Sequence, residues 1–315
     1  MSDQVIAFVF PGQGSQKTGM LAEAHERFPS VRDTFAEASQ ALGYDMWELI
    51  QQGDQAALNL TETTQPVLLT SSVALWRAWL EQGGPLPAIM AGHSLGEFSA
   101  LVCAGAMDFV DAVTLVRQRG VFMQTAVPVG EGAMAAIIGL DDESINRICA
   151  DVSSSTGEVV AAVNFNSPGQ VVIAGHTGAV EAAITALKEA GAKRALPLPV
   201  SAPFHTALMK PAGDQLAAAV AELSITTPAI PVVHNVHAET ESEPQKIRAL
   251  LVEQIYSPVL WTGCIEAIIN AGATDIVECG PGKVLSGLNR RIDKSLQSYS
   301  LEEPGDLVAT LEALL

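Results

Sequence analysis

Short apolar runs alternate with longer segments of helical period along most of the chain, and this alternation predicts the order of its elements. Buried strands are predicted at Val5–Phe10, Pro87–Gly92, Val232–Val236 and Asp275–Glu278. Helices are predicted at Thr64–Gln82, with Pro66 in the first turn, at Gly96–Ala104 and at Phe109–Thr125. Buried strands that alternate with helices of this kind favour an α/β fold with a mostly parallel sheet.

The stretch between Pro128 and Leu198 has a rhythm of its own. Its predicted strands are Gly132–Gly139, Val159–Asn164, Gln170–Ala174 and Lys193–Leu198, and its predicted helices are Glu143–Ala150 and Ala179–Ala190. This order of one strand, a helix, two strands, a helix and a last strand is that of ferredoxin-like units. We therefore predict a small ferredoxin-like α+β subdomain at residues 128–198, inserted into a large discontinuous α/β domain of residues 1–127 and 199–315.

The composition predicts a folded protein with a large core and without a membrane-spanning segment. Hydrophobic residues make up 48% of the 315 positions and charged residues 17%, which is ample for a large buried core and argues against disorder. The longest apolar runs, such as Val5–Phe10, are too short to span a bilayer. No basic patch precedes that first run, so it is predicted to be a strand and not a signal peptide. We expect a soluble protein.

Charge and cysteine content bear on the partners and the cellular compartment of the protein. The formal net charge is −18, from 17 basic and 35 acidic residues, which argues against a nucleic-acid or anionic-membrane partner. The four cysteines show no CxxC spacing and stand in apolar surroundings, so buried free thiols are expected, as in a reducing cytoplasm. No exposed apolar helix or coiled-coil heptad is predicted, and we expect a monomer.

A glycine-rich turn after the first strand raises the question of a nucleotide site. Gly12-Gln13-Gly14 begins like a dinucleotide-binding fingerprint, but the third glycine of that fingerprint would fall at Lys17. Lys17-Thr18 ends like a phosphate-binding loop, but the two glycines of that loop would fall at Pro11 and Gln16. Neither nucleotide motif is therefore complete.

His234 and His237 raise the question of a metal site. They stand three residues apart in a predicted strand, so their side chains would face opposite sides of the sheet. No third ligand stands near them in sequence. We expect no metal ion.

A G-x-S-x-G pentapeptide, Gly92-His93-Ser94-Leu95-Gly96, joins a predicted strand to a predicted helix. Small residues on either side allow the sharp turn that lifts the serine hydroxyl out of the sheet. The hydroxyl then lies at a helix N-terminus, where free N–H groups and the helix dipole favour developing negative charge. The backbone N–H of Leu95 is the natural first donor to an oxyanion. Alone, the pentapeptide also fits a glycine-flanked turn with an unreactive serine.

A nucleophilic serine needs a general base, and two histidines are candidates. His93 adjoins Ser94 on the tight turn, so its side chain should point away from the hydroxyl. His205 lies in the loop Val200–His205 directly after the predicted insert. Such a loop lets a base reach a nucleophile at the carboxyl edge of the sheet, which makes His205 the better candidate. Before any family comparison, a solvated loop histidine fits His205 equally well.

Further short motifs are distributed along essentially the whole chain. They are Phe10–Gln16, Thr64–Pro66, Gly92–Glu97, Arg119–Gly120, Phe122–Met123, Asn164–Gln170, Pro203–His205, Gln254 ahead of Ser257–Pro258, and Glu278–Gly282. Each is weak alone, but in this combination and order they resemble the malonyl-CoA:acyl carrier protein transacylases, which charge the carrier protein of fatty-acid synthesis. The resemblance implies a hydrolase-like α/β core with a ferredoxin-like insert, the same division that the chain pattern predicts.

The resemblance also implies roles for five residues at the reacting centre. Ser94 would be the nucleophile and His205 its base. Gln254 matches the position whose backbone carbonyl orients the histidine, where hydrolases of similar fold place a carboxylate. The backbone amides of Gln13 and Leu95 would form the oxyanion hole.

Three further residues are implied to select the acyl group. Arg119 matches the family's anchor for the free malonyl carboxylate, a group that suits the planar guanidinium fork. Alone, Arg119 fits a surface helix equally well. Gln65 is implied to be a polar contact in the acyl pocket. Relatives that accept branched acyl units tend to carry a small residue directly before the histidine, so Phe204 argues for malonyl.

The implied reaction is a ping-pong transfer of malonyl from malonyl-CoA to Ser94 and then to the pantetheine thiol of an acyl carrier protein, without metal, nucleotide or prosthetic group. A serine hydrolase would use the same serine and base and stays open as an alternative. A non-enzymatic scaffold that only binds a carrier is a second alternative, which Ser94, His205 and Arg119 argue against.

Docking of a carrier is a separate question, because carriers of this pathway are typically acidic and so is this chain. A local basic patch must then overcome the repulsion. Two clusters qualify, Lys188 with Lys193 and Arg194, and Lys283 with Arg290, Arg291 and Lys294. We predict that Lys193, Arg194, Arg290 and Arg291 dock the carrier from both sides of one cleft. Two solvated helix faces are the alternative.

Overall fold

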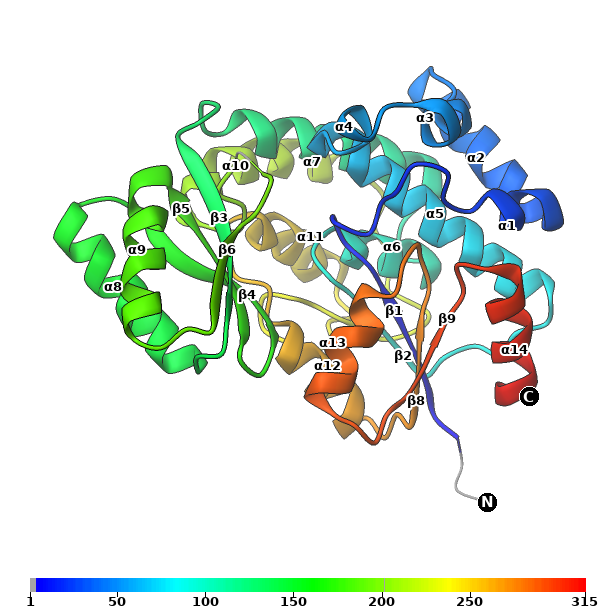
Figure 1. Cartoon of the computed structure of the whole chain (residues 1–315). Helices are drawn as coiled ribbons and strands as arrows, with labels where there is room; N and C mark the ends of the chain where they lie inside the picture. Colours follow the sequence, from blue (N-terminus) through cyan, green and yellow to red (C-terminus); the bar gives the residue numbers. More distant parts are fainter. Residues whose placement is uncertain (1–3, 201) are drawn as a thin grey trace.

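A computed structural model of the protein describes residues 4–200 and 202–315, and two separate sheets organise it (Figure 1). The larger sheet has the strand order β7-β2-β1-β8-β9, and every neighbouring pair is parallel. Its strands are β1 Ile6–Phe10, β2 Ile89–Gly92, β7 Val232–Val233, β8 Asp275–Glu278 and β9 Gln297–Ser300. The predicted α/β fold with a mostly parallel sheet is confirmed.

Helices cover both faces of the parallel sheet. The helices that belong with this sheet, some of them packed on other helices, are α1 Ala22–Arg27, α2 Pro29–Leu42, α3 Met46–Gln52, α4 Gln55–Leu58, α5 Thr61–Glu81, α6 Leu95–Cys103, α7 Phe109–Thr125, α10 Lys210–Ala221, α11 Pro244–Glu253, α12 Trp261–Asn270, α13 Val284–Ile292 and α14 Pro304–Leu314, with 3-10 turns η1 Ala207–Met209 and η2 Gln254–Tyr256. Side chains along β1 alternate between two cores: Phe8 packs in the core that contains α5, and Val9 packs in the core that contains α12. Burial of both faces explains the unbroken apolar runs in the sequence.

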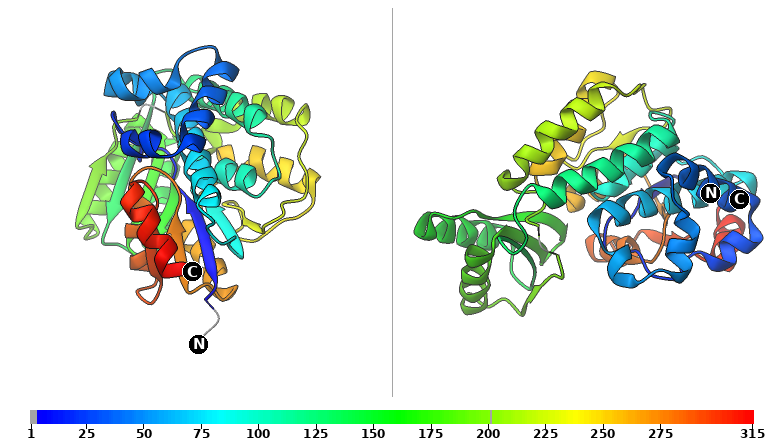
Figure 2. Two further views of the ribbon diagram at one scale, coloured as in Figure 1. Left: turned by 90° about the vertical axis from the view of Figure 1, so that its right-hand side faces the viewer. Right: turned by 90° about the horizontal axis from the view of Figure 1, so that it is seen from above.

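The second sheet forms an antiparallel module between α7 and η1. Its elements are β3 Gly132–Ile138, α8 Asp142–Thr156, β4 Val160–Ser167, β5 Gln170–His176, α9 Thr177–Glu189 and β6 Arg194–Pro197, with strand order β4-β5-β3-β6. The helices α8 and α9 pack on one face over a core of their own, which includes Ile137 and Ile173. Figure 2 shows this module projecting from one end of the molecule. The ferredoxin-like insert is confirmed as a fold, while its boundaries at residues 128 and 198 stay a prediction.

Several predicted element bounds need correction. The helix predicted at Thr64–Gln82 begins at Thr61, so Pro66 lies inside it and past its first turn. Because the polar run Thr61–Thr64 lacks apolar periodicity, the sequence pattern did not predict that the helix begins at Thr61. The strand predicted at Val232–Val236 ends at Val233, because the next two residues turn inward to bond a buried glutamate. Also absent from the predicted elements are β9, the helices before α5, and the helices α10, α11, α12 and α14.

No helix within residues 4–200 and 202–315 is both long enough and apolar enough to cross a membrane.

Candidate active site

The turn between β2 and α6 presents the Ser94 hydroxyl at a sharp bend. Ser94 has φ 50° and ψ −109°, a strained conformation for a residue other than glycine. A Cβ on Gly92 would lie 1.9 Å from the backbone of Gly96, and a Cβ on Gly96 would lie 2.0 Å from the carbonyl oxygen of Phe10. Only glycine fits at either position, so the spacing of the pentapeptide follows from the close packing of this turn against the end of β1.

His205 lies against the serine and completes a hydrogen-bonded chain. Its Nε2 is 2.9 Å from Ser94 Oγ, and its Nδ1 is 2.8 Å from the backbone oxygen of Gln254. Because a carbonyl can only accept, Nδ1 carries the hydrogen and Nε2 is left to accept the hydroxyl proton. His205 is only 4% exposed. The alternative of a solvated loop histidine is therefore wrong.

The electrostatic surroundings keep the His205 ring neutral. Burial and, to a smaller extent, the charge of Arg119 lower its pKa to about 3, although the hydrogen bond to the Gln254 carbonyl opposes both effects. A neutral ring with a free Nε2 is the form that can act as a general base.

Arg119 projects from α7 into the same site and is 1% exposed, so the surface-helix alternative is also wrong. Its Nη1 donates to Gln65 Oε1 at 2.8 Å, and its Nη2 donates to Gln254 Oε1 at 2.9 Å and to Ser94 Oγ at 3.3 Å. Burial lowers the pKa of Arg119 to about 10, against an opposing effect of Glu97. The buried Arg119 Nε has no acceptor within the described part of the chain, so the guanidinium keeps unused donor capacity for an anionic group.

A cavity of about 120 Å³ opens onto the hydroxyl between the two sheets. It is lined by Gln13, Gln65, His93, Ser94, Leu95, Arg119, Met123, Met134, Asn164, Leu198, Val200, Phe204 and His205. The backbone N–H groups of Gln13 and Leu95 donate no hydrogen bond within residues 4–200 and 202–315, so both are available to an oxyanion. Phe204 adds an apolar wall beside the base.

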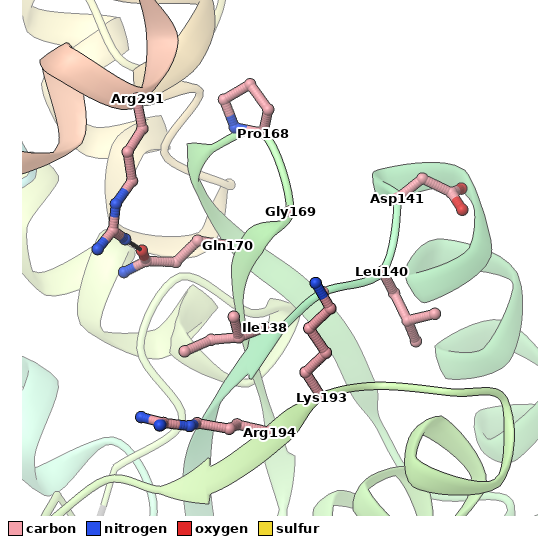
Figure 3. A pocket seen from close by; sticks show the side chains of 10 residues that line it. Ile138, Leu140, Asp141, Pro168, Gly169, Gln170, Lys193, Arg194 and Arg291 are labelled. Atoms are coloured by element: carbon pink, nitrogen blue, oxygen red, sulfur yellow. Dashed lines mark hydrogen bonds between the residues drawn. The ribbon is translucent and has the colours of Figure 1, made fainter.

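Three of the four predicted docking residues line a second, more open cavity of about 690 Å³ (Figure 3). Lys193 and Arg194 come from the antiparallel module and Arg291 from α13, where its side chain bonds the Gln170 carboxamide. Arg290 lines a different cavity, with Lys283 and Asp306. The structure therefore brings together Lys193, Arg194 and Arg291, but not Arg290.

Three polar residues that were not predicted from the sequence support the serine turn. Asn235 Oδ1 accepts from the backbone N–H of Ser94 at 2.8 Å, and its Nδ2 donates to the Gly92 carbonyl at 2.7 Å. Asn166 Oδ1 is 2.8 Å from His93 Nε2, which holds that ring away from the hydroxyl. Glu97 is buried beneath the turn. Glu97 and Asn166 stand inside recognised motifs, whereas Asn235 follows an apolar run and gave no signal.

His234 is not positioned as predicted. Because β7 ends at Val233, His234 and His237 do not share a strand, and their ring centres lie 6.1 Å apart. His234 Nδ1 instead contacts Glu97 Oε1 at 2.7 Å. Within the described residues, no three His, Cys, Asp or Glu side chains are grouped to hold a metal ion.

Comparisons with known proteins find relatives along nearly the whole chain. The profile of the family described as acyl transferase domain matches residues 7–302. The malonyl CoA-acyl carrier protein transacylase of Salmonella typhimurium is 60% identical over 305 residues, which cover 97% of this chain and 98% of that protein. The crystal structure of an acyl carrier protein S-malonyltransferase from Vibrio cholerae is 56% identical, with a TM-score of 0.95 over 97% of this chain and 99% of that one. A malonyl-transacylase in complex with its type II PKS acyl-carrier protein is 54% identical, with a TM-score of 0.97 over 98% of this chain and 100% of that one.

Proposed function

The chain belongs to the acyl transferase family, among the malonyl-CoA:acyl carrier protein transacylases, and from this we propose that it transfers malonyl from malonyl-CoA to the thiol of an acyl carrier protein in fatty-acid biosynthesis. The observation that carries the proposal is the buried cation beside the nucleophile: Arg119 Nη2 is 3.3 Å from Ser94 Oγ. The malonyl carboxylate lies two bonds from the acyl carbon. A cation at this place therefore favours a malonyl over an uncharged acyl group.

We assign the reaction steps to residues as follows. As Ser94 Oγ bonds to the thioester carbonyl carbon, its proton passes to His205 Nε2. The carbonyl electrons move to oxygen, where the N–H groups of Gln13 and Leu95 stabilise the charge. Collapse of this intermediate breaks the C–S bond, and His205 returns the proton to sulfur as the thiol of CoA leaves. A malonyl ester remains on Ser94, and the carrier thiol reverses these steps.

The Gln254 carbonyl takes the orienting place that a carboxylate has in serine hydrolases. Its oxygen, 2.8 Å from His205 Nδ1, fixes the ring tautomer without adding a full negative charge. We infer that Gln65 holds the guanidinium fork through its 2.8 Å contact with Arg119 Nη1. Phe204 limits the room beside the acyl group, which favours malonyl over α-methyl branched units.

Intact-mass measurement tests the proposal directly. Incubation with malonyl-CoA should add one malonyl group to the protein, and later addition of acyl carrier protein should remove it and place it on the carrier. A burst followed by slow turnover in water indicates transfer, whereas steady release of free malonate would identify a hydrolase instead.

The acylation rate should also resist acid. Because the His205 pKa is lowered from 6.5 to about 3, the ring stays neutral when the pH falls through the usual histidine range. We expect kcat/KM for Ser94 acylation to show no acid limb near pH 6.5 between pH 8 and pH 5. Rapid-quench measurement of ester formation gives this profile, and a midpoint near 6.5 would contradict the assignment of a buried, neutral base.

We propose that the carrier docks at the cavity lined by Lys193, Arg194 and Arg291. Positive charge from both the antiparallel module and α13 borders this cavity, which an acidic carrier requires on a chain of net charge −18. Because Arg290 lines another cavity, we assign it no part in docking.

Charge reversal tests this assignment. Arg194→Glu and Arg291→Glu should each raise the KM for the carrier and weaken its salt dependence, because a rim charge acts mainly on encounter. Acylation of Ser94 by malonyl-CoA should change little. Arg27→Glu is the matched control: it changes net charge equally but lies on α1, at the other end of the molecule from the antiparallel module (Figure 1). Parent-like carrier kinetics at low salt in both variants would refute the site.

We propose a cytoplasmic location, which the four free cysteines support. The predicted monomeric state stays a prediction.

A further inference from the structure

Glu97 is a fully buried carboxylate directly beneath the nucleophile. It belongs to the first turn of α6 and is 0% exposed. Its Oε2 accepts from the backbone N–H of Asn235 and from Gln254 Nε2, each at 2.9 Å, and its Oε1 is 2.7 Å from His234 Nδ1. A carboxylate is costly to bury, and the catalytic steps assign it no contact with substrate.

Gln254 connects this carboxylate to every reacting group. The side-chain Nε2 of Gln254 donates to Glu97 and, at 3.0 Å, to the Ser94 carbonyl. The side-chain Oε1 accepts from Arg119 at 2.9 Å, and the backbone oxygen accepts from His205 at 2.8 Å. One residue thus holds the nucleophile, the base and the carboxylate anchor.

Opposite charges hold the two ends of this amide. The NH₂ end faces the Glu97 carboxylate and the oxygen end faces the Arg119 guanidinium, so the amide can be oriented in only one way. Among residues 4–200 and 202–315, no carboxylate contacts the buried guanidinium directly, and Glu97 is the charged neighbour that stabilises it. In the free site, Glu97 therefore balances the charge of Arg119 across one amide.

We propose that Glu97 is a positioning residue for acyl transfer, acting through the Gln254 side chain as the buried counter-charge of Arg119. The proposal rests on the proposed function. In serine hydrolases a carboxylate bonds the catalytic histidine directly. Here the Glu97 carboxylate bonds the side chain of Gln254, and the backbone carbonyl of Gln254 bonds the histidine. At this greater distance the charge of Glu97 holds Arg119 and His205 in place and leaves the guanidinium free to bind the carboxylate of malonyl.

Glu97→Gln removes the charge and keeps the shape. The new oxygen can accept from Asn235 and Gln254, and the new NH₂ can donate to His234 Nδ1 if the ring proton moves to Nε2. His234 Nε2 is buried and has no partner within the described residues, so it makes no hydrogen bond in either tautomer. The variant should therefore fold and isolate the contribution of the charge.

We expect kcat per acylatable serine to fall by roughly 10- to 100-fold in Glu97→Gln, by analogy with the loss of a hydrogen-bond partner that orients a metal ligand. The KM for malonyl-CoA should not rise, because Arg119 remains and loses a competing anion. Mass measurement of the Ser94 ester counts active sites, so loss of folded protein does not enter the rate. A purely structural role would instead lower stability and leave kcat per site unchanged.

Glu278→Gln is the matched control. Glu278 is also a buried glutamate, 1% exposed, but it accepts from the backbone N–H groups of Leu285 and Ser286 at the start of α13 and contacts none of the reacting residues. It should lose stability and keep the kcat and KM of the parent per acylatable site. An equal fall in kcat in both variants would overturn the proposal.

A second pair of variants reaches Glu97 from its other side. His234→Asn retains an N–H near the place of Nδ1, whereas His234→Leu removes that donor. His234→Leu should show the kcat loss of Glu97→Gln, and His234→Asn should retain most of the parent rate. Parent-like kcat in Glu97→Gln and His234→Leu would refute the role of Glu97. A parent protein that forms no Ser94 ester would instead refute the proposed function.

Discussion

The Ser94→Ala protein should gain no mass on incubation with malonyl-CoA. Ser94 Oγ lies 2.9 Å from His205 Nε2 and faces the free N–H groups of the predicted oxyanion hole. Loss of the hydroxyl removes the attacking atom, so both half-reactions stop. His205→Ala keeps the nucleophile but removes its base, and acylation should slow by roughly 10²- to 10⁴-fold.

Ser99→Ala provides the control for Ser94→Ala. Ser99 is a buried serine on α6, five residues after Ser94, and its hydroxyl has no hydrogen-bond partner within the described residues. Its removal should leave both the mass gain and the rate of acylation as in the parent. A malonyl-sized increment on the Ser94→Ala protein would show that another side chain is the nucleophile.

The parts of the site that were predictable from sequence depend on local geometry. The serine turn needs glycines two residues to either side of Ser94, because their Cβ atoms would collide with neighbouring backbone. The helix Phe109–Thr125 and the strand Asp275–Glu278 were predicted with their observed bounds. The helix begins directly after its capping residue Asp108, and the strand ends just before the turn Gly280–Gly282. Constraints of this kind are visible within a few residues of sequence.

The parts that escaped prediction depend on contacts between distant segments. Arg119 stands in a helix whose pattern fits a surface face, and only the fold shows that its side chain is buried against Gln254. Asn235 supports Ser94 from 141 residues away, and no local pattern marks it. The family resemblance supplied Arg119 and Gln254, but it did not supply the contacts of Asn235 or Glu97.

The two neighbouring arginines of α13 show that the direction of a side chain on a helix was not predictable from charge alone. Arg290 and Arg291 are equivalent by charge and position in the sequence. Successive residues on a helix point about 100° apart, so only one of the two can face the antiparallel module. Arg291 lines the cavity with Lys193, and Arg290 lines a different one. The rotation of α13 about its axis decides which arginine faces the cavity, and a cluster of charges in the sequence does not predict that rotation.

Arg119→Ala should change the choice of acyl group more than the chemistry. The guanidinium is buried, so its loss leaves the malonyl carboxylate in a desolvated place without a partner, which costs about 2–5 kcal/mol. That cost corresponds to a fall in kcat/KM for malonyl-CoA of roughly 30-fold to several thousand-fold. Acetyl-CoA has no carboxylate and should lose far less, or should gain.

The ratio of the two specificity constants, malonyl-CoA over acetyl-CoA, isolates this effect from loss of folded protein. Arg119→Lys is the informative second variant, because it keeps the charge that balances Glu97 but cannot contact both Gln65 and Gln254 through a planar fork. It should recover part of the malonyl preference and little of the parent rate. An unchanged ratio in Arg119→Ala would remove Arg119 from the acyl pocket, and the Glu97 pairing would then have to be explained by stability alone.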